Sequence, residues 1–456
     1  MPAVWLDEVM FTDPAANLYF GNGFTSSAWS VQTRNEFWAG NAPLYSILLY
    51  YWMQLFGFSI VAVRSLNNVL MTVSALMLWV AVIKLNLVTA TWSRVALITL
   101  LISGYGTSWC ARSGRYDSLG ITLFAASILI YSIPLTWLRC VLLTCIGIFL
   151  PMAGLNLLPY AVIFCSLLFI YLGKPILREC FCIAIGIIIG ILFLYILFST
   201  NGVWNDFVAS ARGLGGHPGL PNFNNSSKDI SFLILLLLSL GIFLYEKKHK
   251  IIRFRSPLSF GLTSGFTIPM VMLVLGRYPT NYSWMAYIPV SICVCSAISK
   301  FNPSNWKRFV IIGFISVACF FGLPFWLTLS IYGGADLDYK QVEALVERNV
   351  KENDWVYSNS STFYAIKPRS NPVFFEAYSF DKSPEEKSKI SVLIINPNDY
   401  EKESTKIGGV WYPSGDRIKP KKSGFLGLKS SIILSKYNLQ VYRRKNDIER
   451  TISKQV

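Results

Sequence analysis

The sequence predicts an all-α polytopic membrane domain, with about ten transmembrane helices plus interfacial helices, followed by a small extracytoplasmic α/β domain. Of its 456 residues, 53% are hydrophobic and only 14% are charged. Apolar stretches of about 17 to 25 residues, the length that crosses a ~30 Å hydrocarbon core, recur from residue 62 to residue 333. The composition then shifts abruptly toward Lys, Glu, Ser and Asn.

The apolar region divides into ten predicted spans, at 62–84, 90–109, 118–134, 137–153, 155–172, 179–198, 229–246, 257–276, 284–299 and 309–332. Short loops rich in Lys and Arg stay on the cytoplasmic side of a membrane. Three loops have this composition, at residues 174–178, 247–255 and 300–308. Each predicted span carries the chain to the other side of the membrane. Counting the spans from these three loops therefore places Asp7, residues 115–117, His217, Arg277 and the tail outside the cytoplasm.

This topology predicts a multi-pass integral membrane protein, and the membrane we expect is a bacterial inner (plasma) membrane. Residues 1–333 form the predicted transmembrane domain, with a first outer loop over 1–61, and residues 334–456 form the domain outside the cytoplasm. An even number of spans also places Met1 outside, although no hydrophobic helix precedes Asp7. We therefore expect that one N-terminal helix is missing from this chain, and a genuine start outside the cytoplasm is the alternative.

The net charge of +16 belongs partly to the cytoplasmic loops and partly to the Lys-rich tail. It therefore indicates a lipid bilayer as partner and argues against nucleic acid. All nine Cys residues lie in or beside the spans, and the pairs Cys180/Cys182 and Cys293/Cys295 are two residues apart. Because such neighbours face different sides of a helix and lack the spacing of metal ligands, we interpret them as small apolar residues.

The first candidate site is the acidic pair Asp7 and Glu8, which comes before the first long apolar stretch. A carboxylate beside a bilayer is costly unless it is paired, hydrated or functional. The apolar run 46–55 is too short and too rich in aromatic residues to span, so it predicts a helix that lies in the interface. We therefore expect the acidic pair at the membrane surface, at the depth of a lipid head group.

Two further sets of charged and aromatic residues fall outside. Arg115, Tyr116 and Asp117 follow the second predicted span, and Arg277 and Tyr282 lie in a short loop between two spans. Arg is well suited to hold a phosphate through planar, bidentate hydrogen bonds. The alternative is that these residues anchor helix ends, with the cations reaching the interface and Asp117 favoured by the helix dipole.

The outer loop 201–229 is polar and Gly-rich and contains His217, so it is a candidate cover for a site, although a lone loop His is more often plain surface. The tail predicts a helix over 337–350 and strands at 355–357, 390–395 and 439–442, with a turn at 396–399. It contains no phosphate loop, catalytic triad or metal-ligand motif. We interpret it as a packing or acceptor-binding module.

Together, the acidic pair, the Pro43-Leu44-Tyr45 segment, the Arg-x-Asp turn and the Arg-Tyr loop before Pro289 resemble the C-type-fold membrane glycosyltransferases. The resemblance covers roughly residues 4–330 and points to the branch of protein O-mannosyltransferases and the lipid A aminoarabinose transferase. It departs from the family pattern at Asn41 and Ala42, where a Lys or His and a first Pro are usual.

The resemblance implies transfer of a hexosyl- or pentosyl-type sugar from a polyprenyl-phosphate donor to an extracytoplasmic acceptor in the cell envelope. Asp7 matches the family's catalytic Asp, Glu8 the acidic residue after it, and Arg115 and Asp117 the Arg-x-Asp turn. We expect inversion with Asp7 as base and Asp117 orienting the acceptor. The donor phosphate is expected on Arg115, Arg277 and Tyr282, and acceptor or loop contacts on Glu36, Tyr116 and His217.

A divalent cation (Mg²⁺, Mn²⁺ or Ca²⁺) on Asp7 and Asp117 is left open, because oxygen ligands suit these ions. The alternative function is a polytopic transporter or lipid flippase with an outer accessory domain. It is disfavoured because the segment lengths show no inverted repeat and the candidate charges lie at the ends of spans. A membrane-anchored sensor is a third possibility, but it would not require the acidic pair.

Overall fold

The computed structural model describes residues 3–29, 32–213, 229–248, 256–275, 282–300, 305–374, 376, 380, 384–420, 424–425, 428–429 and 437–445. The chain forms two compact units. Unit 1 comprises Met1–Gly40, Ser46–Val63 and Leu327–Val456, and unit 2 comprises Asn41–Tyr45 and Arg64–Trp326. The first outer segment thus belongs to the same unit as the tail, whereas the predicted domains separate them at residue 334.

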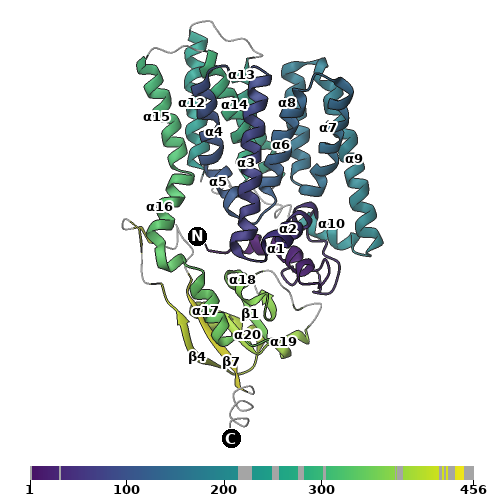
Figure 1. Ribbon diagram of the computed structural model, residues 1–456, viewed down its shortest axis with the longest axis vertical. Coiled ribbons are helices and arrows are strands. Elements are labelled where there is room, and N and C mark those ends of the chain that lie inside the picture. Colours follow the sequence, from purple (N-terminus) through teal and green to yellow (C-terminus); the bar gives the residue numbers. More distant parts are fainter. Residues whose placement is uncertain are drawn as a thin grey trace. The chain divides into compact units, whose positions relative to one another are not determined.

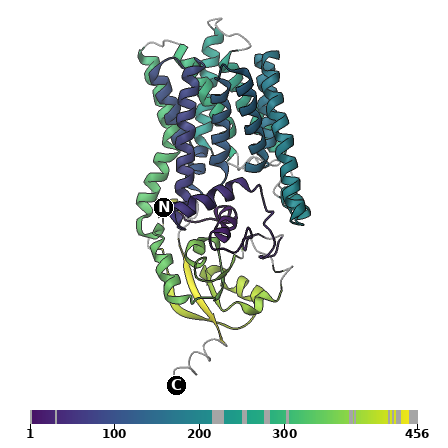
Figure 2. The ribbon, with the colours of Figure 1, turned by 45° about the vertical axis from the view of Figure 1, so that its right-hand side comes forward.

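Unit 2 is built from the apolar helices, which run side by side in Figures 1 and 2. They are α3 (Ile60–Lys84), α4 (Thr91–Ser103), α5 (Tyr105–Arg112), α6 (Asp117–Tyr131), α7 (Thr136–Ala153), α8 (Leu157–Leu172), α9 (Leu177–Thr200), α10 (Trp204–Gly213), α12 (Ile230–Lys248), α13 (Pro257–Val274), α14 (Trp284–Lys300) and α15 (Asn305–Phe320). Helix α16 (Leu323–Gly333) begins in unit 2 and continues into unit 1 from Leu327, and the first residues of α3 also belong to unit 1. Each of the ten predicted spans coincides with one helix or with a consecutive pair, so the predicted polytopic fold is confirmed.

Five helices among the described residues are long and apolar enough to cross a membrane, or six if the bent pair α15 and α16 counts as one span. Helices α4, α6, α8 and α14 are apolar but shorter. A hydrocarbon core leaves backbone polar groups without water, which is why nearly every apolar stretch here is helical. The chain is therefore a multi-pass integral membrane protein.

Two predicted spans are broken at a glycine. Helix α4 ends before Gly104 and α5 begins after it, while α15 and α16 meet at Gly322 with a bend of 42°. The two breaks touch, because a Cβ added to Gly322 would overlap the carbonyl oxygen of Ser103. A Cβ on Gly104 would lie 2.6 Å from the ring of Tyr287. Glycine at both positions therefore permits an approach that no side chain would allow.

Unit 1 contains α1 (Leu6–Tyr19), most of α2 (Leu44–Phe56) and the tail domain. The predicted helix over 46–55 is confirmed as part of α2. The tail has helices α17 (Lys340–Asn349), α18 (Phe363–Ile366), α19 (Glu386–Lys389) and α20 (Tyr400–Ile407), and strands β1 (Trp355–Ser358), β2 (Asn371–Phe374), β3 (Val392–Ile395), β4 (Trp411–Ile418), β5 (Gly424–Phe425), β6 (Leu428–Lys429) and β7 (Leu439–Arg444).

The tail strands form one sheet in the order β2-β1-β3-β7-β4, with β5 and β6 as a separate pair. Strand β1 is parallel to β2 and β3, and β7 is antiparallel to β3 and β4. The sheet core includes Tyr357, Val373, Leu393 and Trp411. The predicted helix and three predicted strands of the tail are confirmed. The two edge strands were missed because β2 and β4 each contain a Pro, which sheets tolerate only at edges or bulges.

Candidate functional site

A short non-helical turn joins α5 to α6 in unit 2, and the side chain of Asn67 on α3 holds it. The Asn67 amide nitrogen donates to the carbonyl oxygens of Cys110 (3.3 Å), Ser113 and Arg115 (2.9 Å). Asn67 is fully buried, and two of these carbonyls have a second donor: the Ser118 hydroxyl bonds to Cys110 at 3.1 Å, and the Arg115 backbone N–H bonds to Ser113 at 2.9 Å. One polar side chain on a neighbouring helix therefore fixes the backbone that carries the predicted Arg-x-Asp residues.

Arg115 and Asp117 form an ion pair at this turn. Arg115 Nε lies 2.8 Å from Asp117 Oδ2, and the two residues are only 4% and 1% exposed. Arg115 Nη2 also donates to the hydroxyl of Tyr282 at 3.3 Å. Because the guanidinium is held from two sides, its planar donor array has a fixed orientation.

Tyr116 completes the cluster. Its hydroxyl lies 2.5 Å from that of Tyr282, and burial raises its pKa well above the usual value for a tyrosine. A Cβ on Gly154 would lie 2.6 Å from the Tyr116 ring, so this glycine makes room for the side chain. The structure thus brings together four of the predicted site residues: Arg115, Tyr116, Asp117 and Tyr282.

A second buried carboxylate, Asp229, lies immediately before α12 and belongs to the same unit. It accepts hydrogen bonds from the hydroxyl of Ser283, next to Tyr282 in sequence, and from the backbone N–H of Phe232 at 2.9 Å. Burial raises its pKa to about 6, and these hydrogen bonds oppose the shift. Gly106 packs against this pair, because a Cβ added to it would overlap the Ser283 Oγ.

The acidic pair of the first outer segment lies in unit 1, on the first turn of α1. Asp7 is half-buried, whereas Glu8 is fully buried and accepts a hydrogen bond of 2.8 Å from the hydroxyl of Tyr364 in the tail. Glu36, also half-buried, accepts from the backbone N–H of Thr33 at 2.9 Å. Glu8 is therefore tied to the tail domain.

Further along α1, Asp13 forms a buried ion pair with Lys367, whose Nζ lies 2.6 Å from Oδ1. The other carboxylate oxygen accepts hydrogen bonds from the Ser26 hydroxyl (2.9 Å) and the Ser27 backbone N–H (2.6 Å). Burial lowers the pKa of Lys367, while the Asp13 charge opposes this. Because both charges are desolvated, removing either would leave the other buried without its partner.

The predicted site residues are therefore distributed over both units. Asp7, Glu8 and Glu36 belong to unit 1, and Arg115, Tyr116, Asp117 and Tyr282 belong to unit 2. That all of them surround one site stays a prediction. Arg277 and His217 lie outside the described residues.

No protein-family model matches the sequence, and no curated protein sequence matches it either. Solved structures do match the fold. The ArnT of Cupriavidus metallidurans in its apo state gives a TM-score of 0.61 at 10% identity, covering 97% of this chain and 94% of that one. The same protein bound to undecaprenyl phosphate gives 0.58 with the same identity and coverage. The chain has the C-type glycosyltransferase fold.

A further structure, the oligosaccharyltransferase of Archaeoglobus fulgidus tethered to an acceptor peptide, gives a TM-score of 0.48 at 12% identity. It covers 89% of this chain and 66% of that one. Because the ArnT match extends over nearly the whole of both chains, the C-type fold includes the tail domain as well as the helical bundle.

The sequence reasoning missed four buried polar residues, of which two belong to each unit. They are Asp13, Asn67, Asp229 and Lys367. A signal existed for Asn67, because polar side chains within a span are rare and usually have a structural or functional role. Asp13 and Lys367 carried no such signal, since they are separated by more than 350 positions and only folding brings them together.

Replacing Asn67 with Ala is expected to destabilise the protein by about 1–3 kcal/mol, because the buried hydrogen bonds from α3 to the turn are lost. Thermal unfolding of the full chain in detergent measures this loss. The matched control is Asn68→Ala, one residue further along α3, where the side chain is exposed. Equal stability of the two variants would show that Asn67 does not hold the turn.

Asp229 predicts a pH dependence of stability. A carboxylate with a normal pKa of about 4 when unfolded and about 6 when folded stabilises the protein below pH 4, and this contribution is lost as the pH rises through 6. Between pH 4 and pH 7 the wild-type chain is therefore expected to lose about 2–3 kcal/mol relative to Asp229→Asn. The free energy of unfolding, measured from pH 4 to pH 7, tests this difference. Asp338→Asn, which changes an exposed carboxylate, is the control. If the pH profiles of the wild type and of Asp229→Asn are parallel, the prediction is wrong.

Proposed function

We propose that this protein is a glycosyltransferase that moves a hexosyl- or pentosyl-type sugar from a polyprenyl-phosphate donor to an acceptor outside the cytoplasm. The observation that carries the proposal is the C-type fold over 97% of the chain, shared with an ArnT structure that holds undecaprenyl phosphate. The acceptor class comprises glycolipids, glycans and proteins of the cell envelope. The buried Arg115, Asp117 and Tyr282 contacts provide independent support, because they orient a cation for an anionic ligand.

In the proposed reaction the donor phosphate is the leaving group. The acceptor hydroxyl oxygen forms a bond to the anomeric carbon from the opposite face while the bond from that carbon to the phosphate oxygen breaks, so the sugar inverts. The proton passes to Asp7, and the electron pair remains on the phosphate. We assign stabilisation of that charge to Arg115 and Arg277, with Tyr282 holding Arg115 in place.

The remaining residues receive supporting roles. Glu8, tied to Tyr364, fixes the first turn of α1 and with it Asp7. Asp117 orients Arg115 and helps place the acceptor, and Glu36, Tyr116 and His217 are proposed acceptor or loop contacts. Because the first outer segment and the tail share one unit, we propose that the tail selects the acceptor.

A divalent cation remains a proposal. Among the described residues, no group of three or more His, Cys, Asp or Glu side chains gathers in a way that would hold a metal ion. An ion would therefore need oxygens of the donor phosphate in addition to Asp7 or Asp117, which Mg²⁺ and Mn²⁺ accept readily. Loss of transfer in EDTA that Mg²⁺, Mn²⁺ or Ca²⁺ restores would support the ion, and unchanged transfer would refute it.

Replacing Asp7 with Asn is expected to lower transfer at least about 100-fold, because the acceptor hydroxyl loses its base. The measurement compares envelope glycans by mass spectrometry in a deletion strain carrying each variant. Asp338→Asn, an exposed carboxylate of the tail, is the control and should restore the missing product fully. Full restoration by Asp7→Asn at equal expression would overturn the base assignment. Translocation of a lipid without consumption of the donor would favour the transporter alternative.

The proposed sidedness places the tail outside the cytoplasm of a bacterial inner membrane. The tail contains no Cys, so Lys406→Cys on exposed α20 introduces a single reactive thiol there. We expect an impermeant maleimide to label it in intact spheroplasts, above the background of the unaltered chain. Lys247→Cys, at the other predicted side, should react only after permeabilisation. The reverse pattern would invert the topology.

A further inference from the structure

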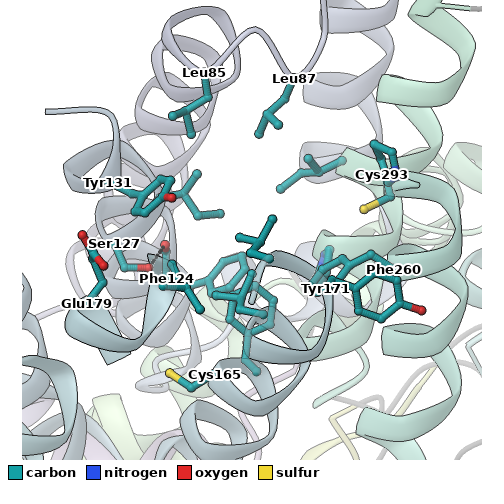
Figure 3. A pocket seen from close by; sticks show the side chains of 18 of the residues that line it. Leu85, Leu87, Phe124, Ser127, Tyr131, Cys165, Tyr171, Glu179, Phe260 and Cys293 are labelled. Atoms are coloured by element: carbon teal, nitrogen blue, oxygen red, sulfur yellow. Dashed lines mark hydrogen bonds between the residues drawn. The ribbon is translucent and has the colours of Figure 1, made fainter. Parts of the chain in front are cut away.

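A cavity of about 390 Å³ lies within unit 2, among α6, α7, α8, α9, α13, α14 and the segment after α3. Figure 3 shows its side chains around an open space, with Leu85 and Leu87 on one side, and with Tyr131 and Glu179 across from Cys293. The lining is largely hydrocarbon, and the volume falls in the range of ligand-binding pockets.

The cavity lies toward the helix ends that adjoin the Lys- and Arg-rich loops. Tyr131 is the last residue of α6, whereas Asp117 of the candidate site is the first. The lining residue of α6 nearest to Asp117 is Phe124, seven residues further on, which at 1.5 Å per residue is ~10 Å along the helix axis, and Arg115, Tyr116, Asp117 and Tyr282 are not among the lining residues. The cavity is therefore distinct from the Arg115 cluster, and an inference about it does not rest on the proposed transfer reaction.

One lining residue is a buried carboxylate whose two oxygens differ in their partners. Glu179 is 3% exposed, and its Oε1 lies 2.8 Å from Arg139 Nη2 and 2.8 Å from Arg178 Nη2. Its second oxygen, Oε2, is buried and accepts no hydrogen bond from any residue that the structure describes. The side chain of Arg178 is half-exposed beside it. Glu179 thus presents a buried acceptor at the wall of an apolar cavity, and the cation Arg178 is paired with it.

We propose that this cavity binds one chain of a membrane phospholipid whose head group carries a hydrogen-bond donor beside its phosphate. The chain fills an apolar space that would be costly to leave empty. The donor, an ammonium or a hydroxyl, bonds to Glu179 Oε2, while Arg178 pairs with the phosphate. This arrangement matches the charges at the rim, and acyl chains are the apolar material that a bilayer supplies at this depth.

The test compares two lipids of equal net charge and equal chains, dioleoyl-phosphatidylethanolamine and dioleoyl-phosphatidylcholine, because only the first has an N–H donor. Binding to the full chain in detergent is measured by native mass spectrometry. We expect the ethanolamine lipid to bind about tenfold tighter, the effect of one hydrogen bond to a charged acceptor. Glu179→Gln should abolish this preference, and Glu246→Gln, a half-buried carboxylate on α12, should keep it.

A second pair of variants tests the cavity itself. Ser127→Phe places a ring in the cavity and should weaken binding of both lipids at least about tenfold. Ser166→Phe adds the same ring at an exposed position of α8, which does not line the cavity, and should have no effect. Equal affinity of the unaltered chain for the two lipids would overturn the proposal, as would undiminished binding by Ser127→Phe. If Ser127→Phe does not fold, the lipid preference of Glu179→Gln and Glu246→Gln decides whether the proposal holds.

Discussion

The hydrogen bonds from Asn67 to the turn between α5 and α6 are the interaction on which the candidate site depends. Inside a bilayer-spanning protein, every backbone carbonyl outside a helix needs a partner from the protein itself. Asn67 donates to the carbonyl of Cys110 in the last turn of α5 and to those of Ser113 and Arg115 in the turn that follows. The chain can therefore leave the helical path where Arg115 and Asp117 are required, without exposing peptide groups to hydrocarbon.

The same constraint explains the positions of the glycines. Helices α4 and α15 both end beside glycines, and Gly322 lies directly against the carbonyl of Ser103. Gly154 gives space to Tyr116, and Gly106 gives space to the pair Ser283 and Asp229. Breaks, turns and buried polar groups thus occur where small residues let backbone segments approach each other closely.

The first outer segment depends on a different interaction. In unit 1 the buried pair of Asp13 and Lys367 and the bond from Tyr364 to Glu8 join α1 to the tail domain. Arg34 adds a third link, through its ion pair with Glu386 at 3.1 Å. The proposed base Asp7 therefore lies on a helix that the tail domain orients, which gives the tail a structural reason to influence the proposed reaction.

The sequence by itself determined the helical bundle, the tail with its central strands, and the turn with Arg115, Tyr116 and Asp117, because apolar length, strand pattern and short-range spacing are local properties. Tyr282 lies 167 positions from Arg115, and only the family resemblance gave the two a shared role before the structure was known. Only the tertiary structure decided that the first outer segment packs with the tail, and that Asn67 and Asp229 support the site. Contacts such as Asp13 with Lys367 join residues more than 350 positions apart, and no local pattern encodes such a partner. The cavity beside Glu179 likewise exists only where six helices and a connecting segment meet, so packing alone creates it.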